Sequence, residues 1–112
     1  MSDLCSDLRL FIINTGADTR LEVGGDLDIA AAAELSDHLD ILIDDGTGPV
    51  HVDMSMVTFC DSSTLAVLVD AWQRLGEADR PLRVVNPSAC VSRLLQITGL
   101  EELFLDHERA HS

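Results

Sequence analysis

An amphipathic segment between two short β-branched segments is the feature that most restricts how this chain can fold. Segment 62–77 carries apolar residues at helical spacing, which predicts a helix with a buried stripe at Leu65, Leu68, Trp72 and Leu75. Segments 50–54 and 82–85 on either side predict strands. A strand–helix–strand unit of this kind requires parallel strands and a right-handed crossover. The chain is therefore predicted to be an α/β protein.

The residues before this unit predict a β-hairpin followed by a helix. Segments 8–13 and 19–23 have the apolar alternation of strands, and turn-forming residues separate them. The glycine pair at 24–25 is expected to end the second strand. Asp28 is expected to cap a helix over residues 29–44.

The residues after the unit predict a third helix and a last short strand. Pro87 is expected at the first position of the helix and Gly99 at its C-terminal cap. Segment 103–105 is predicted to be a strand, followed by a polar tail over residues 106–112.

These elements predict a single domain in the order β-β-α-β-α-β-α-(β). The length of 112 residues suits one domain. We therefore expect one domain over residues 1–112, with a core at about 8–105 in which helices pack against a mixed β-sheet.

The charge of the chain restricts its partners. The formal net charge is −13, from 20 acidic and 7 basic residues, and every basic residue is an arginine. Such a field repels nucleic acid and anionic lipid, so we expect neither as a partner and instead predict a basic patch on a protein. No segment approaches the roughly 18 apolar residues of a membrane span, and the N-terminus lacks the pattern of a signal peptide. Three widely spaced cysteines favour a reducing compartment, so we expect a cytoplasmic protein.

A polar cluster directly precedes the helix over residues 62–77. It consists of Asp61, Ser62, Ser63 and Thr64, and it lies between the end of a strand and the start of a helix. Ligands and anions favour this location because free N–H groups and the helix dipole point there. If Asp61 caps the helix, the serine hydroxyls are left without a capping role. A phosphate there adds about −1.5 to −2 charges. Four aspartates are expected to crowd the same edge, so that a phosphate repels a partner: Asp26, Asp28, Asp53 and Asp61.

The residues favour a binding protein over an enzyme. Ser62, His51 and Asp53 are the residue types of a hydrolase triad, but the G-x-S-x-G motif is missing. Apart from the two in the tail, the histidines lack metal-ligand spacing, and a chain without lysine cannot carry a P-loop. Cys60 could be a reactive thiol, although a buried small side chain is the favoured interpretation. We therefore predict neither a catalytic residue nor a metal or cofactor.

Three separated segments closely resemble the STAS domain of bacterial anti-sigma factor antagonists. They are GGDLDIAAAAEL (24–35), VHVDMSMVTFCDSSTLAVLVDAW (50–72) and LRVVNPSACVSRLLQITGLEELF (82–104). The resemblance runs from about Leu8 to Leu105 and implies that Ser62 is the phosphoacceptor. It also implies a partner-binding surface at Gly25, Asp26, Leu27, Asp28, Asp61, Ser62, Ser63, Thr64 and Leu65.

The resemblance further implies a partner-switching cycle. The unphosphorylated antagonist binds an anti-sigma factor that is also a serine/threonine kinase, so that a sigma factor is released. The kinase phosphorylates the antagonist, which ends binding, and a metal-dependent serine phosphatase resets it. The chain departs from the family pattern at Thr64, where a glycine is usual, and at segment 77–81, where a glycine pair is common.

Two alternatives stay open at this point. The chain could be a STAS accessory subunit of a transport ATPase or of a stress-sensing complex. The phosphate could also lie on another hydroxyl, because a helical wheel points Ser63 most directly at water and puts Thr64 beside the core. A wheel is least reliable at the first residue of a helix, and the resemblance selects Ser62.

Overall fold

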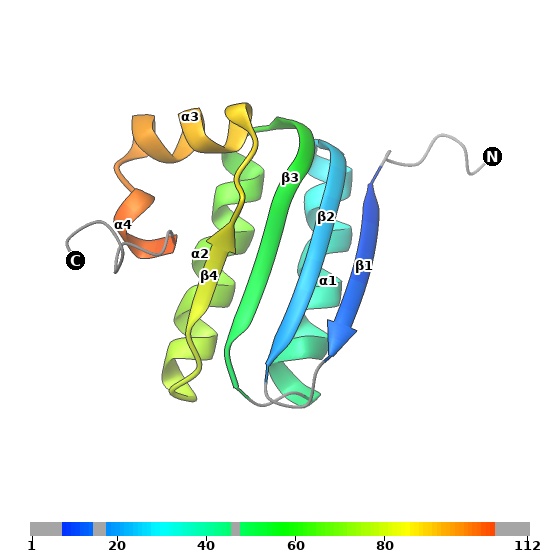
Figure 1. Cartoon of the computed structure of the whole chain (residues 1–112), viewed down its shortest axis with the longest axis vertical. Helices are drawn as coiled ribbons and strands as arrows, with labels where there is room; N and C mark the ends of the chain where they lie inside the picture. The colour runs from blue at the N-terminus through cyan, green and yellow to red at the C-terminus, as the bar shows by residue number, and fades with distance from the viewer. Residues whose placement is uncertain (1–7, 15–17, 46–47, 105–112) are drawn as a thin grey trace.

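The computed structural model describes residues 8–14, 18–45 and 48–104, which form a four-stranded sheet and four helices (Figure 1). The elements in chain order are β1 (Arg9–Asn14), β2 (Thr19–Leu27), α1 (Ile29–Asp45), β3 (Val50–Cys60), α2 (Ser62–Glu77), β4 (Leu82–Val85), α3 (Ala89–Thr98) and α4 (Glu101–Phe104). The strand order is β1-β2-β3-β4, with β1 antiparallel to β2 and the other neighbours parallel. The α/β class with a mixed sheet is therefore confirmed.

Helices α1 and α2 lie side by side on one face of the sheet, while α3 contacts β3 and α4 contacts β4 (Figure 1). We call the opposite sheet face, on which Glu22 and Asp53 are neighbours, the open face. The core fills the layer between the strands and the two long helices. Its fully buried members include Leu21, Leu35, Leu39, Val50, Val52, Met54, Leu68, Leu75 and Leu82. Each such side chain contributes about 1.5–3 kcal/mol of burial.

The predicted crossover unit is confirmed. Strands β3 and β4 are parallel, and α2 spans the predicted residues 62–77. The hairpin of β1 and β2 is confirmed as well, although its turn at 15–17 lies outside the described residues. Trp72 packs against the core at its rim, where it is half-buried. Among the described residues, no helix is both long and apolar enough to cross a membrane.

Two strands are longer than predicted. The glycine pair at 24–25 does not end β2, which continues to Leu27, and β3 continues to Cys60 instead of ending at residue 54. The register between these strands shifts between Glu22 and Gly24 and again at Gly25. Gly25 has a φ of 97°. A Cβ on Gly24 would stand 2.9 Å from the Cβ of Met56. The glycines therefore accommodate two bulges and a close strand approach.

The C-terminal elements also differ from the prediction. Pro87 does not open α3, because Ser88 is the N-cap and the helix begins at Ala89. Gly99 is confirmed as the C-cap, with a left-handed φ of 75°. The predicted strand at 103–105 is wrong, since the chain makes the helical turn α4, which buries Phe104 completely. Leu105 and the predicted tail over residues 106–112 lie outside the described residues.

Candidate functional site

The two predicted binding segments meet at one end of the sheet. Leu27 and Cys60, the last residues of β2 and β3, are paired in the ladder. Asp28 and Asp61 follow them directly, and each precedes a helix. We call residues 25–28 and 61–65 together the helix-start surface. Parallel pairing thus brings together all nine residues that the sequence predicts for partner binding.

Both helices at this surface are capped by aspartate. The Asp61 carboxylate accepts a hydrogen bond from the Ser63 N–H at 2.9 Å. The Asp28 carboxylate accepts one from the Ala31 N–H, also at 2.9 Å. Both predicted caps are therefore confirmed. Since aspartate satisfies the first turn of α2, the Ser62 hydroxyl is not needed for capping, and no described residue hydrogen-bonds to it.

The three hydroxyl residues of the cluster have different environments. Ser62 is exposed, Ser63 is half-buried and Thr64 is only 1% exposed. The wheel-based ranking of Ser63 as the most exposed is therefore wrong, because the first residue of the helix projects off its end. The expectation that Thr64 lies beside the core is confirmed. Its hydroxyl donates a hydrogen bond to the Leu27 carbonyl at 3.3 Å.

Not every predicted binding residue is accessible to a partner. Leu27 is fully buried, and Leu65 and Thr64 are buried as well. These three side chains pack in the interior, beneath the exposed residues of the helix-start surface. Exposed or half-buried positions at the same surface belong to Asp26, Asp28 and the first residues of the cluster, Asp61–Ser63. A partner can therefore touch mainly carboxylates and serine hydroxyls here.

Three of the four aspartates expected at this edge are found there. Asp26 pairs with Phe59 in the ladder and accepts a hydrogen bond from the Thr58 hydroxyl. Asp28 and Asp61 cap the helices. The expectation for Asp53 is wrong, because β3 runs on to Cys60 and leaves Asp53 in the middle of the strand. The helix-start surface thus carries three carboxylates.

Two apolar side chains beside this surface were missed by sequence reasoning. Ile29, the first residue of α1, is 73% exposed, and Phe59 of β3 is 47% exposed. The sequence pattern predicted a strand only over residues 50–54 and left Phe59 outside it. The sheet face to which the Phe59 side chain points could therefore not be predicted. The ladder pairs it with Asp26, which puts both on the open face next to the helix starts. Exposed large apolar side chains beside polar groups are typical of protein-binding surfaces.

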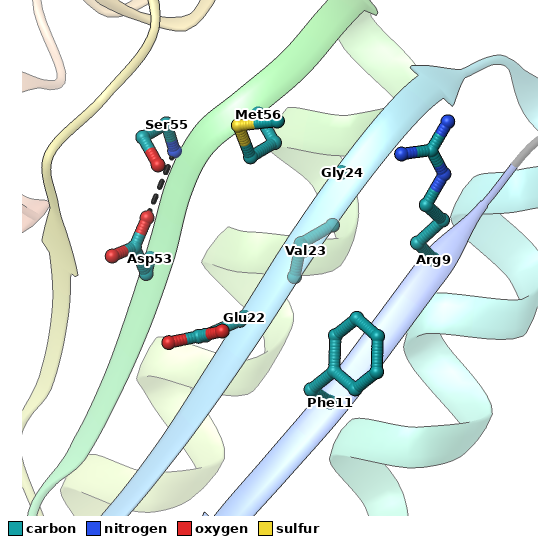
Figure 2. A pocket seen from close by; sticks show the side chains of 8 residues that line it. All are labelled: Arg9, Phe11, Glu22, Val23, Gly24, Asp53, Ser55 and Met56. Atoms are coloured by element: carbon teal, nitrogen blue, oxygen red, sulfur yellow. Dashed lines mark hydrogen bonds between the residues drawn. The ribbon is translucent and has the colours of Figure 1, made fainter.

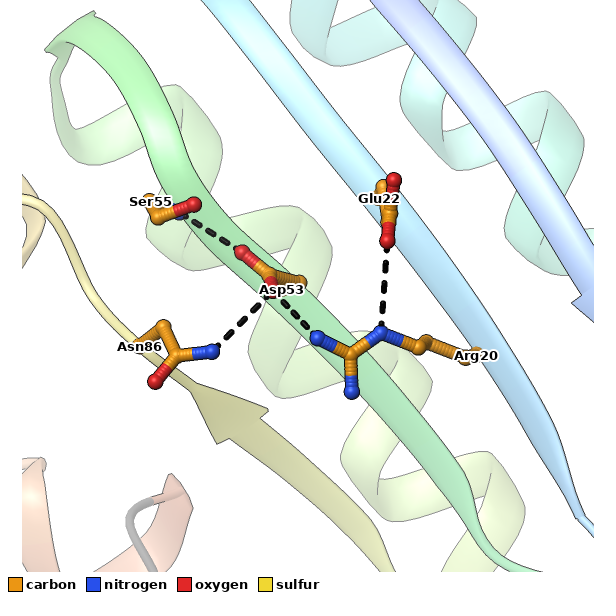
Figure 3. Close-up of polar contacts among 5 residues, drawn as sticks. All are labelled: Arg20, Glu22, Asp53, Ser55 and Asn86. Carbon is orange, nitrogen blue, oxygen red and sulfur yellow. Dashed lines mark hydrogen bonds and ion pairs between the residues drawn. The ribbon is translucent and has the colours of Figure 1, made fainter.

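Asp53 belongs instead to a polar network on the open face (Figure 3). Its carboxylate accepts hydrogen bonds from the Ser55 N–H at 2.9 Å and the Asn86 amide at 3.1 Å, and it pairs with Arg20. Burial raises the pKa of Asp53, but these hydrogen bonds and the Arg20 charge outweigh it and hold the pKa below its ordinary value. The Arg20 guanidinium also reaches Glu22 at 3.4 Å. The network ties β2, β3 and the segment after β4 together.

The structure provides no support for a hydrolase. The His51 imidazole lies 3.5 Å from the Asp18 carboxylate, near the start of β3. Ser62 lies beyond the other end of this strand, roughly 30 Å away at the rise of an extended chain. The residues of the hypothetical triad therefore do not meet. Within the described ranges, no three His, Cys, Asp or Glu side chains form a group that could hold a metal ion.

The environment of the Cys60 thiol disfavours the reactive thiolate form. Burial raises its pKa to about 12, with further contributions from the neighbouring Cys90 and from the Asp61 charge. The thiolate that a nucleophile requires is therefore scarce at neutral pH. Cys60 is half-buried and packs against the core, as a small apolar residue does.

A hollow of about 200 Å³ lies on the open face, and no residue of the helix-start surface lines it (Figure 2). It is lined by Arg9, Phe11, Glu22, Val23, Gly24, Asp53, Ser55 and Met56. Gly24 leaves the floor of the hollow without a side chain, while Phe11 and Met56 stand at its sides. Both of its carboxylates are already paired with Arg20. It therefore lacks the free, convergent polar groups of a catalytic site.

A family model matches most of the chain. The model described as "Mlab, STAS domain" matches residues 12–106. An anti-sigma-B factor antagonist of Staphylococcus epidermidis is 35% identical over 83 residues, which cover 74% of this chain and 77% of that protein. The anti-sigma-B factor antagonist of Staphylococcus aureus strain NCTC 8325 is 34% identical over the same lengths.

Solved structures agree in fold. The unphosphorylated form of the anti-sigma factor antagonist SpoIIAA superposes with a TM-score of 0.72 at 21% identity, covering 93% of this chain and 92% of that one. An anti-sigma factor antagonist from Mycobacterium paratuberculosis gives a TM-score of 0.76 at 20% identity, covering 90% and 87%. SpoIIAA from Bacillus has also been solved in its phosphorylated form, with a TM-score of 0.67 at 19% identity and coverage of 93% and 96%.

Proposed function

The chain belongs to the STAS-domain family of anti-sigma factor antagonists, and we propose that phosphate on Ser62 switches its binding. In this proposal the unphosphorylated chain binds an anti-sigma factor that is also a serine/threonine kinase, and a sigma factor is released. The Ser62 oxygen then attacks the γ-phosphorus of ATP, ADP leaves, and the hydroxyl proton passes to a base of the kinase. A metal-dependent phosphatase hydrolyses the phosphoserine and restores the hydroxyl. The chain acts as a binding protein rather than as an enzyme.

The position of Ser62 is the observation that carries this proposal. Its side chain is exposed at the first residue of α2, and Asp61 already performs the capping. A kinase can therefore reach the hydroxyl without unfolding the helix. Thr64 and Ser63 are poorer acceptors, because Thr64 is buried and Ser63 is half-buried.

The surroundings of Ser62 explain why a phosphate there ends binding. The group adds about −1.5 to −2 charges and three oxygens at a surface that a partner must cover closely. Asp26, Asp28 and Asp61 already make this surface acidic. Burying a doubly charged phosphate among carboxylates costs far more than burying a hydroxyl. The helix itself tolerates the charge, since the dipole favours anions at its first turn.

The test uses the kinase partner purified from the native cell. Wild-type chain incubated with this kinase and ATP is expected to gain one phosphate, which mass spectrometry maps to Ser62. Ser62→Ala is expected to bind the kinase and stay unmodified, while Ser62→Asp is expected to lose binding with its melting temperature preserved. Equal affinity of the two variants, or phosphate on Ser63 in the wild type, would contradict the proposal. Co-purification with a transport ATPase and without a kinase would favour the accessory-subunit alternative.

A further inference from the structure

The hollow on the open face combines charged groups of both signs with apolar walls (Figure 2). The ladder between β1 and β2 arranges its residues in two neighbouring rows. Phe11 lies opposite Glu22 in one row, and Arg9 lies opposite Gly24 in the next. The hollow therefore has a carboxylate in one row and a guanidinium in the other.

The Arg9 guanidinium is available to a ligand. Arg9 is exposed, and no carboxylate of the described residues pairs with it. Arg20 and Arg74, in contrast, each pair with two carboxylates. In Figure 2 the Arg9 guanidinium stands on the side of Gly24, where the floor of the hollow has no side chain. Because a guanidinium presents a planar fork of donors, it is suited to hold the carboxylate of a small molecule.

Glu22 supplies the opposite charge. Its Oε2 atom lies 3.4 Å from Arg20, whereas its Oε1 atom accepts no hydrogen bond from the described residues and is directed away from Arg20 (Figure 3). Because Phe11 is its ladder partner, an ammonium group bound by Glu22 also lies near an aromatic ring, which attracts cations. The Asp53 carboxylate, in contrast, already interacts with three donors.

The rest of the hollow favours an apolar group of limited size. Phe11 and Met56 are exposed at its sides, and Gly24 leaves its floor open. A cavity of about 150 Å³ can hold benzene, and the hollow measures about 200 Å³. It is smaller than the roughly 300–1,000 Å³ of pockets for drug-sized ligands. The space therefore suits a molecule with one ring and one or two small polar groups.

The charges of the chain decide among such small molecules. The formal net charge of −13 repels an anion. A cation is attracted by Glu22 but repelled by Arg9, which lies in the neighbouring row. A zwitterion satisfies both groups, and because it carries no net charge, the field of the chain does not oppose its approach.

We propose that the hollow binds a free α-amino acid with an aromatic or other large apolar side chain. Arg9 holds the carboxylate of this ligand and Glu22 its ammonium group. The side chain of the ligand lies over Gly24, against Phe11 and Met56. A catalytic site needs several polar groups that converge on one reacting atom, whereas binding a zwitterion needs one group of each charge. The proposal does not depend on phosphorylation, since no residue of the helix-start surface lines the hollow.

An NMR titration of the full chain with L-phenylalanine tests this binding. The amide signals of residues 22–24 and 53–56 are expected to shift in a saturable manner, with a Kd below about 1 mM. Two analogues each lack one charge: 3-phenylpropanoate has no ammonium group, and 2-phenylethylamine has no carboxylate. Each is expected to bind the wild type about tenfold more weakly or worse, because one charged group of the hollow is then left without a partner.

Two variants exchange these preferences. Arg9→Gln should weaken the binding of phenylalanine by about tenfold or more but should not weaken that of 2-phenylethylamine. Glu22→Gln should weaken the binding of phenylalanine to a similar extent but should not weaken that of 3-phenylpropanoate. The matched control is Arg93→Gln, which changes an exposed arginine on α3 and should leave all three affinities unchanged. Melting temperatures show whether each variant keeps its fold.

The wild type alone can overturn the proposal, so the test does not depend on how the variants fold. Signals that do not shift up to about 10 mM phenylalanine, roughly ten times the expected limit, would exclude the site. Equal affinity of the wild type for phenylalanine and 2-phenylethylamine would show that Arg9 does not bind the carboxylate. Equal affinity of Arg9→Gln and Arg93→Gln for phenylalanine would contradict the proposal in the same way.

Discussion

The hydroxyl of Thr64 donates a hydrogen bond to the backbone carbonyl of Leu27 and so joins the start of α2 to the end of β2. The two residues are far apart in sequence, and both are buried. The bond holds the two halves of the helix-start surface together. A glycine, which the resemblance to the family would lead us to expect at this position, has no hydroxyl to make it.

Removal of this bond is expected to cost stability without moving the phosphate. Thr64→Val keeps the shape of the side chain but leaves the Leu27 carbonyl without its donor, so we expect a loss of about 1–2 kcal/mol in urea unfolding. Thr64→Gly additionally loses up to about 1 kcal/mol of helix propensity. Phosphosite mapping should still find Ser62 in both variants. Phosphate on Ser63 in either one would show that Thr64 selects the acceptor.

Phe59 is expected to be an anchor for the kinase partner. It is exposed beside Asp26 at the edge of the helix-start surface. Phe59→Ala should weaken kinase binding by about 1–3 kcal/mol, which is roughly 5- to 150-fold in affinity, because truncated aromatic anchors cost this much. Isothermal titration calorimetry measures the loss. Ile97→Ala on α3 is the matched control, and an equal loss there would mean that Phe59 has no special role.

Asp53 is expected to make the stability of the fold depend on pH in the acid range. Its pKa lies below the ordinary value of 3.8, so the carboxylate stabilises the fold above about pH 4, and this contribution is lost as pH falls through the lowered pKa. Wild-type stability should therefore decrease more steeply below pH 4 than that of Asp53→Asn. Asp53→Asn should also lose roughly 1–3 kcal/mol at pH 7, because Arg20 loses the closer of its two carboxylate partners.

The matched control for this pH series is Asp37→Asn, which changes an exposed carboxylate on α1. It is expected to follow the wild-type curve in urea unfolding at each pH. Parallel curves for Asp53→Asn and the wild type would show that the network around Arg20 does not contribute to acid stability.

Arg80 is expected to be irreplaceable by lysine. This buried side chain donates from Nε to the Gly48 carbonyl at 2.9 Å, and from Nη1 to the Leu42 and Ile43 carbonyls at 3.2 and 3.0 Å. It thus satisfies the C-terminal carbonyls of α1. A lysine cannot reproduce the fork of donors, so Arg80→Lys should lose about 2–3 kcal/mol in urea unfolding.

The exposed Arg93 on α3 provides the comparison. Arg93→Lys should change the free energy of unfolding by less than about 0.5 kcal/mol. If Arg80→Lys were equally mild, the three hydrogen bonds would contribute little to the fold.

Features set by neighbouring residues could be predicted from the sequence, whereas features set by distant ones could not. The spacing of Leu65 and Leu68 determines α2, and Asp61 caps it through the N–H of a residue two positions on. The extension of β3 to Cys60 depends instead on β2, which pairs with it along its whole length. The helical turn at Phe104 likewise depends on burial against the rest of the fold.

The parts of the site that depend on residues close in sequence were predicted correctly. The parts that depend on the direction of a side chain were not. The two caps and the burial of Thr64 followed from spacing. The relative exposure of Ser62 and Ser63 did not, because a helical period does not apply at the first residue. The place of Asp53 depended on the full length of β3, and the direction of Phe59 depended on the register shifts between β2 and β3, neither of which the sequence pattern revealed.

The bulged ladder between β2 and β3 determines where the chain can tolerate insertions and deletions. It aligns Leu27 with Cys60, so a residue gained or lost within either strand would displace one helix start relative to the other. The connections that enter β2, β3 and β4 lie at the opposite end of the sheet, since these strands are parallel. Loops of different length can therefore be accommodated at that end without changing the spacing of the two capping aspartates.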